Sequence, residues 1–302
     1  MKVRELLDEI RTLDMVLPEF QREYVWSREQ AKQLIVSLYN GYPTGSLLLW
    51  KTESPPEIKN LTIAPDRIGT THVILDGQQR LTTLYLLTRG EIPPYYREED
   101  IQNDPRDLYF DLDTGELQYF QVARMRHNPN WVQVTQCFEE PQGVNAMEIA
   151  RGKASTPELA FELAERYLRN LTALKGVLER DYPIQVVPPS AHIDEAIDVF
   201  DRVNSLGTKL TDADLALAHV TGKWPQARQV LKAKMEELAE RRFRFDLTFM
   251  TRALVAVVKQ RALFETIHQT PSEELTAGWE RLERILDYLV CRDMGTSTRP
   301  RI

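Results

Sequence analysis

The pattern of apolar and polar residues changes in character along the chain. Short apolar runs of strand length occur in the first half, and from about residue 155 apolar residues recur mostly at helical spacing. The runs predict strands over 45–50 and 71–76, and alternation on both sides of Asp113-Thr114-Gly115 predicts a hairpin. A later strand over 182–187 is expected to rejoin the first sheet.

Local signals place the ends of several helices. Ser27 and Gln30 form a predicted capping box before an amphipathic stretch, and Thr156 followed by Pro157 predicts a helix that runs to about Arg180. Further helices are predicted over 81–88, 193–205, 212–221 (capped by Thr211 with Asp214), 225–243, 247–264 and 272–292. The expected fold class is therefore α+β: a mixed α/β domain over 1–190, then a helical domain over 191–302.

Composition narrows the class of protein. The 302 residues are 42% hydrophobic and 27% charged, which is typical of a globular protein. No apolar run is long enough to cross a membrane and the start does not resemble a secretory signal, so we expect a cytoplasmic protein. The cysteines, Cys137 and Cys291, lack metal-ligand spacing and are expected to be thiols. The polar tail 294–302 is explained equally by a frayed terminus and by a fragment of a longer protein.

The net charge of −7 argues against binding nucleic acid by bulk electrostatics alone. Two local basic runs remain, "ARMRH" at 123–127 and "RRFR" at 241–244. For both, a solvated helix face or loop is the favoured interpretation.

The stretch "HVILDGQQRLTTLYLL" at 72–87 carries the densest candidate chemistry. A strand that turns at Gly77 into a helix directs backbone N–H groups and the helix dipole at one point, which suits a phosphate. Arg80 in the first helical turn suits phosphate oxygens, and Asp76 suits Mg²⁺ or a ribose hydroxyl. Gln78 and Gln79 suit a water or a base edge.

A purely structural interpretation of this stretch stays open. Asp76-Gly77 is also a common tight turn, and Arg80 would then pair with a nearby acid. Two other segments are similarly dense. "LPEFQREYVWSREQ" at 17–30 places Gln21 and Arg22 among aromatic residues, and "VFDRVNSLGTKLTDADL" at 199–215 contains Arg202 and Asn204 near a helix end. A surface loop and a helix-turn-helix connection are the corresponding structural alternatives.

Taken in order, "FQREYVW", "ILDGQQRLTTL" and "FDRVNSLGTKLTDADL" resemble the N-terminal domain family of GmrSD-type restriction enzymes and related phage-defence proteins. "YPTGSLLLW" at 42–50 matches the family's segment between the first two motifs. The resemblance covers about residues 5 to 290. It implies a core similar to the ParB and sulfiredoxin fold, hydrolysis of a nucleoside triphosphate such as GTP with Mg²⁺, and a role in restricting modified phage DNA.

The resemblance also implies site residues. Asp76, Gln78, Gln79 and Arg80 would form the catalytic part, with Gly77 against the phosphates and Asp76 on the metal. Other expected nucleotide-binding residues, matched to the first and third motifs, are Gln21, Arg22, Arg202 and Asn204.

Many relatives continue into a nuclease domain of the His-Asn-His type. The five histidines here, for which structural roles are expected, are His72, His127, His192, His219 and His268. DNA cutting would then need a nuclease domain or partner subunit outside this chain. Three hypotheses remain: a GTP-preferring NTPase that acts as a switch, a non-catalytic module binding nucleotide or modified DNA, and a metal-dependent nuclease. The acidic balance and the lack of carboxylates near Asp76 argue against the last.

Overall fold

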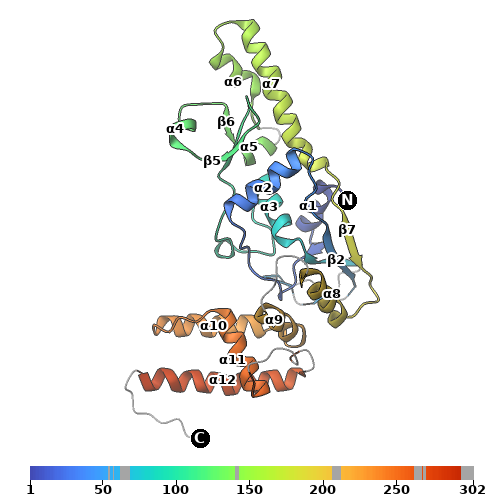
Figure 1. The fold of residues 1–302 in the computed structure, drawn as a ribbon, viewed down its shortest axis with the longest axis vertical. Coiled ribbons are helices and arrows are strands. Elements are labelled where there is room, and N and C mark those ends of the chain that lie inside the picture. The colour runs from blue at the N-terminus through green and yellow to red at the C-terminus, as the bar shows by residue number, and fades with distance from the viewer. Residues whose placement is uncertain are drawn as a thin grey trace. The chain divides into compact units, whose positions relative to one another are not determined.

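The structure is a computed structural model that describes residues 1–53, 55–56, 58–61, 69–139, 143–205, 212–261, 267 and 270–293. The chain forms two compact units. Unit 1 comprises Met1–Leu17, Glu23–Ser54 and Asn60–Pro188, and unit 2 comprises Pro18–Arg22, Pro55–Lys59 and Pro189–Ile302. Unit 2 therefore includes two short segments from the N-terminal part of the chain. Both units are shown in Figure 1.

A four-stranded mixed sheet lies in unit 1. The strand order is β1 (Met15–Val16), β3 (Thr71–Asp76), β2 (Leu47–Thr52) and β7 (Ile184–Val187). β2 and β3 are antiparallel, whereas β7 joins β2 in parallel register with Leu49 opposite Val186. The two predicted early strands, β2 and β3, are confirmed. The predicted pairing of the later strand, β7, with the same sheet is also confirmed.

Three helices pack with this sheet around one apolar core, namely α1 (Val3–Arg11), α2 (Arg28–Tyr39) and α3 (Gln78–Arg89). The capping box of α2 is confirmed, because Ser27 Oγ accepts from the Gln30 N–H at 3.3 Å and Gln30 Oε1 accepts from the Ser27 N–H at 2.9 Å. α1 was not predicted, although its apolar residues follow a helical pattern, with Leu6, Leu7 and Ile10 fully buried.

A smaller sheet completes unit 1. β4 (Leu108–Asp111) pairs with β5 (Leu117–Tyr119) as the predicted hairpin, and β6 (Trp131–Gln133) adds a third antiparallel strand. Three residues are too few for alternation to be recognised, so β6 was not predicted. The remaining short elements are η1 (Glu98–Asp100), α4 (Val122–Met125), α5 (Val134–Phe138) and α6 (Ala146–Lys153).

The long helix of unit 1, α7 (Pro157–Lys175), begins as predicted. The Thr156 side chain accepts from the Leu159 N–H at 3.3 Å. Its predicted end at Arg180 is wrong, because the α-helix stops at Lys175 and a 3-10 turn, η2 (Gly176–Glu179), follows. Gly176 and the approach to β7 explain the earlier end, since helix propensity is low at glycine and the chain must become extended.

Unit 2 is helical. Its elements are α8 (Ile193–Ser205), α9 (Asp212–Lys223), α10 (Ala227–Glu240), α11 (Leu247–Lys259) and α12 (Ser272–Asp293). α9 to α12 share an apolar core, in which Gly278 of α12 lies so close to Val258 of α11 that a Cβ would come within 2.2 Å of Val258 Cγ2. The α+β class with a helical C-terminal part is confirmed. The predicted cap, Thr211 with the Asp214 side chain, lies outside the described residues. Across the parts of the chain that the structure describes, no helix combines the length and apolar content needed to cross a membrane.

The two cysteines form no disulfide, as expected. Burial raises the pKa of the Cys137 thiol to about 12, so the reactive thiolate is scarce at neutral pH. We expect native Cys137 to resist iodoacetamide at pH 8 and to react fully in denaturant, as measured by mass spectrometry of its peptide. Rapid alkylation in the native protein would contradict this burial.

Candidate functional site

The centre of the candidate site is a turn between β3 and α3. Gly77 occupies it with φ 98° and ψ 7°, in the left-handed region that favours glycine. A Cβ at this position would come within 2.2 Å of Leu47 Cδ2 on the neighbouring strand. The turn can therefore press against β2 only because residue 77 has no side chain.

Arg80, in the first turn of α3, is held by three hydrogen bonds. Its Nη1 donates to Thr44 O at 2.8 Å, and its Nη2 donates to Ser46 O at 2.8 Å and to Asp76 Oδ2 at 2.9 Å. Only 14% of the Arg80 side chain is exposed, against 34% for Asp76. The nearby acid expected under the structural interpretation is thus present. Asp76 and Arg80 form an ion pair whose carboxylate is the more accessible partner.

The loop that receives Arg80 comes from the segment "YPTGSLLLW". Gly45, with φ 83°, lies so close to the guanidinium that a Cβ would be 2.8 Å from Arg80 Nη1. The ring of Tyr182 lies on another side, with its centroid 5.9 Å from Arg80 Cζ. The contact between this loop and Arg80 was not predicted from the sequence. A glycine between two polar residues just before a buried strand was the available signal.

Gln78 and Gln79 are both nearly inaccessible, at 5% and 6% exposure. The Gln79 Oε1 accepts from the N–H groups of Val25 and Trp26 at 2.9 and 3.2 Å, and its Nε2 donates to Glu23 O at 2.9 Å. Gln79 therefore attaches the helix start to residues 23–26. The second half of "FQREYVW" and the "DGQQR" turn are parts of one hydrogen-bonded arrangement.

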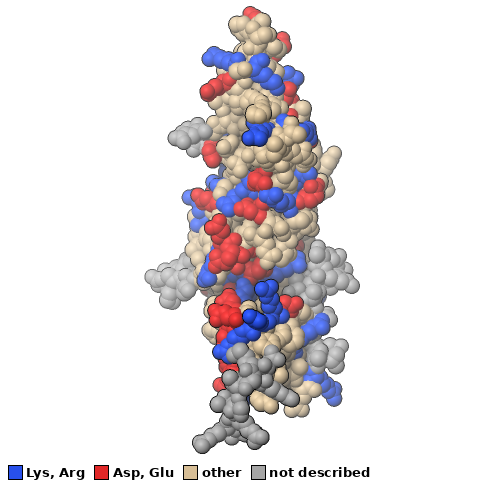
Figure 2. Space-filling view, turned by 90° about the vertical axis from the view of Figure 1, so that its left-hand side faces the viewer, with Lys and Arg blue, Asp and Glu red and all other residues tan. Residues whose placement is uncertain are grey.

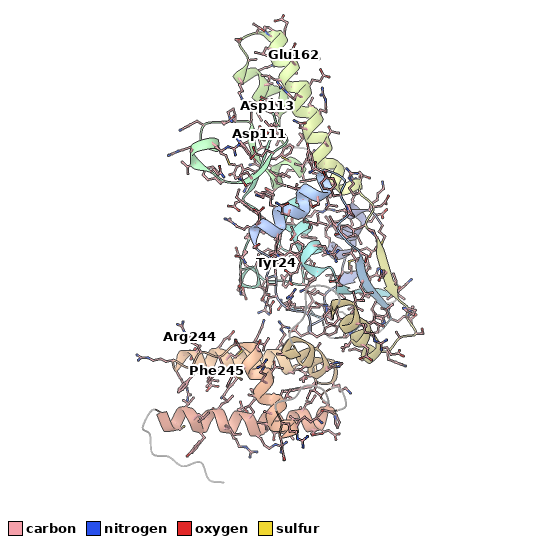
Figure 3. All side chains as sticks on the ribbon, viewed as in Figure 1. Tyr24, Asp111, Asp113, Glu162, Arg244 and Phe245 are labelled. Carbon is pink, nitrogen blue, oxygen red and sulfur yellow. The ribbon has the colours of Figure 1, made fainter. Side chains whose placement is uncertain are left out.

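Tyr24 strengthens this attachment. Its hydroxyl group lies 2.9 Å from Thr83 Oγ1, one turn further along α3, and burial raises the Tyr24 pKa to about 12. Figure 3 shows Tyr24 beside this part of unit 1. Tyr24 is therefore a neutral phenol near neutral pH, and it contributes to the packing of α3.

Gln21 and Arg22 belong to unit 2, so the structure assigns the two halves of "FQREYVW" to different units. Within unit 2, Lys59 Nζ donates to Gln21 O at 2.9 Å, and Arg228 Nη1 donates to Glu19 O at 3.3 Å. Lys59 and Arg228 are 1% and 3% exposed. Nothing in the linear sequence indicated that these two basic residues are buried against residues 18–22.

The residues expected from the third motif lie on α8 of unit 2. Arg202 is exposed there, and Phe200 of the same helix packs its ring 5.8 Å from that of Phe20. Asn204 lies within α8, but its side chain is outside the described residues. Unit 1 thus brings Asp76 and Arg80 together, and unit 2 contains Gln21, Arg22, Arg202 and Asn204.

The groups around Asp76 indicate how a Mg²⁺ ion would be held there. Within the ranges that the structure describes, no three His, Cys, Asp or Glu residues are grouped so as to hold a metal ion. Mg²⁺ in nucleotide sites is commonly held by one or two carboxylates, substrate phosphates and waters. Asp76 therefore fits an ion that arrives with a nucleotide better than an ion held by the protein alone.

The four histidines that the structure describes lie at separate places in the fold. His72 Nδ1 lies 2.9 Å from Glu9 Oε2 in unit 1, and His219 is buried on α9 of unit 2. His192 precedes α8, His127 follows α4, and His268 lies outside the described residues.

Comparison with known proteins identifies the class. The family model described as "GmrSD restriction endonuclease, N-terminal domain" matches residues 3–221. The chain belongs to this family. It is also 26% identical, over 276 residues, to an uncharacterized protein of Methanocaldococcus jannaschii. That alignment covers 74% of this chain and 43% of the relative, so the chain spans less than half of the relative's length.

Proposed function

We propose that the β3–α3 turn binds a nucleoside triphosphate, GTP by the family resemblance, and hydrolyses it with Mg²⁺. The observation that supports this proposal is the Asp76–Gly77–Arg80 arrangement. An accessible carboxylate lies beside an arginine that three hydrogen bonds hold in place, at a helix start whose first N–H groups suit an anion. Fixed charges of this kind stabilise phosphoryl transfer without reorganisation.

Each residue has a distinct proposed role. Asp76 would hold the Mg²⁺ that accompanies the phosphates, and Arg80 and the N–H groups of the first turn would balance phosphate charge. In the hydrolysis a water attacks the γ-phosphorus, and the bond from this phosphorus to the β–γ bridging oxygen breaks to give the diphosphate and inorganic phosphate. A water-orienting role for Gln78 rests on the family resemblance alone, because its side chain is only 5% exposed. Gln79 is a positioning residue, because its amide group binds residues 23–26. For Gln21, Arg22, Arg202 and Asn204, a nucleotide-binding role rests on the family resemblance alone.

In this proposal the hydrolysis acts as a switch in the restriction of phage DNA. The nucleotide site would lie on a core similar to the ParB and sulfiredoxin fold. Cleavage of modified DNA would be performed by a nuclease domain or subunit outside this chain. The match to the N-terminal domain of a restriction endonuclease family supports this division of labour.

The test is phosphate release from GTP, ATP, CTP and UTP with Mg²⁺, comparing the wild type with Asp76→Asn. Asparagine keeps the shape and still accepts the Arg80 hydrogen bond, but it loses the charge that holds the metal. We expect turnover to fall by about 10²-fold, by analogy with removing one group that stabilises a transition state. Asp8→Asn is the matched control, since Asp8 is also an accessible acid of unit 1, paired with Arg89 at 2.7 Å, and its loss is expected to leave turnover unchanged.

A second candidate function is nucleotide binding without turnover. It is favoured by one observation, namely that Gln79 and Arg80 already form several hydrogen bonds with the protein. Saturable binding by calorimetry with no phosphate release from any of the four nucleotides would support this candidate and overturn the NTPase. If the folded protein neither binds a nucleotide nor releases phosphate, both candidate functions are overturned.

A further inference from the structure

Unit 2 presents arginines and aromatic rings together where α10 runs into α11. We call this the aromatic–arginine surface and define it by Arg241, Arg242, Arg244, Phe245, Phe249 and Arg252. It includes the basic run "RRFR", for which the sequence alone favoured a solvated face or loop. These residues lie beyond 3–221, so the family match does not account for them. Figure 3 shows Arg244 and Phe245 at this end of α10.

The aromatic rings form a column. The rings of Phe245 and Phe249 are stacked, with centroids 4.5 Å apart and planes 12° apart, and Phe243 continues the stack at 6.4 Å and 18° from Phe245. Phe249 is 44% exposed. A column of nearly parallel rings that reaches solvent offers a flat apolar face on which another planar ring can stack.

The charges around the column are mostly positive. Residues 241–252 contain four arginines and one acid, Asp246, a local balance of +3 in a chain of net charge −7. The Asp246 carboxylate is engaged as the α11 cap, accepting from the Phe249 N–H at 2.7 Å. Arg241 forms a pair with Glu237 at 3.4 Å, but both side chains are about 40% exposed, and such surface pairs are weak. Figure 2 shows Lys and Arg gathered on the drawn face of unit 2, beside a group of acidic side chains.

Arg252 lies on the same side of α11 as Phe249, since residues three apart on a helix are neighbours. Arg244 precedes Phe245 directly and is exposed. Arginines thus lie next to the ring column, both before Phe245 in the chain and after Phe249 on α11. A ligand for this surface needs a planar ring and, at short spacing from it, negative charge.

We propose that the aromatic–arginine surface binds single-stranded DNA, with an unpaired base stacked on Phe249 and the flanking phosphates bound by the arginines. An acidic peptide would leave the ring column unused, and an apolar partner would leave the arginines unpaired. In a duplex, the base faces are covered by their neighbours. Only an unpaired polynucleotide carries ring and phosphate in every unit. The choice of DNA over RNA rests on the proposed function in restriction.

Stacking is tested by fluorescence anisotropy of the full chain with a labelled oligothymidine of about 20 nucleotides, long enough for one site. Phe249→Leu keeps an apolar side chain but loses the flat ring, and we expect the dissociation constant to rise about tenfold. Phe249→Trp keeps a ring and should bind at least as well as the wild type. Phe161→Leu is the control, because Phe161 on α7 of unit 1 is even more exposed, at 65%.

The charge contribution is tested by repeating the titration at several salt concentrations. Arg244→Gln should reduce the slope of log affinity against log salt by about 0.7, the value for one phosphate contact on a single strand. Arg169→Gln on α7, with 72% of its side chain exposed, should leave the slope unchanged. A blunt duplex should bind more weakly than the single strand. An oligouridine of equal length tests RNA against DNA. Tighter binding of the oligouridine than of the oligothymidine would overturn the choice of DNA.

The proposal is overturned if the wild type does not bind the oligonucleotide at low salt, or if Phe249→Leu, folded by circular dichroism, binds as well as the wild type. Equal binding of the duplex would also overturn it. No nucleoside triphosphate is present in these titrations, and Phe249→Leu is expected to release phosphate at the wild-type rate. Failure of this inference and failure of the NTPase proposal are therefore distinguishable.

Discussion

Gly77→Ala is expected to lower the free energy of unfolding of unit 1 by about 3 kcal/mol. Two costs combine. A non-glycine residue in the left-handed region costs about 1 to 2 kcal/mol, and forcing a methyl group into a packed core costs about 1 to 3 kcal/mol. Both apply here, because Gly77 has φ 98° and its Cβ would meet Leu47 Cδ2 at 2.2 Å.

Urea unfolding, with hydrogen exchange of β3 and α3 peptides to localise the effect, measures this change. Gly152→Ala is the matched control, because Gly152 lies within α6 and nothing would lie within 4 Å of its Cβ. Alanine there should be neutral or stabilise by about 0.5 to 1 kcal/mol. The Gly77→Ala/Leu47→Ala double variant removes the clash but leaves the backbone strain. An unchanged unfolding free energy in Gly77→Ala would show that the turn is not as tightly packed as the structure has it.

Arg80→Ala is expected to have two effects, loss of NTP turnover and a fall of about 3 kcal/mol in the unfolding free energy of unit 1. Hydrogen bonds from a charged group contribute about 1.5 to 3 kcal/mol each, and a partly buried carbonyl that loses its donor keeps part of its desolvation cost. Alanine would remove the donors to Thr44 O, Ser46 O and Asp76. Arg80 therefore holds the β2 loop as well as serving the proposed nucleotide site.

Arg89→Ala separates these effects from the loss of any arginine on α3. Arg89 pairs with Asp8 at 2.7 Å at the accessible end of the same helix, and its removal should cost less than about 1 kcal/mol. Arg80→Lys keeps the charge but cannot form the same fork of hydrogen bonds. Full turnover in destabilised Arg80→Ala, measured at low temperature where it stays folded, would contradict the phosphate role. Full stability of Arg80→Ala would contradict the loop role.

Short-range patterns predicted much of unit 1 correctly. The capping box at Ser27, the cap at Thr156 and the two apolar strands around 47–52 and 71–76 each depend on residues a few positions apart. The same holds for the turn at Gly77, where the change from a strand to a helical pattern required a flexible residue. Prediction failed at the end of α7 and at β6, where elements are short or end gradually.

The contacts of the candidate site were less accessible to sequence reasoning. Asp76 and Arg80 are four residues apart on one side of a helix start, so their pairing followed from local geometry. The loop 44–46 lies far from Arg80 in sequence, and only the pairing of β2 with β3 brings it there. Gln79 was expected to face a ligand, whereas its amide group is bound to residues 23–26.

Local sequence patterns were sufficient for the α+β class, most helix and strand positions, the family and the turn that could receive a phosphate. These depend on periodicity, caps and motifs, which are written within a few residues. Long-range packing sets which partners Arg80 and Gln79 have. It also buries Lys59 and Arg228 against residues 18–22 and stacks the rings around "RRFR" in a column. Each of these contacts joins residues whose proximity is fixed by how the helices and strands pack, and no local pattern encodes that packing.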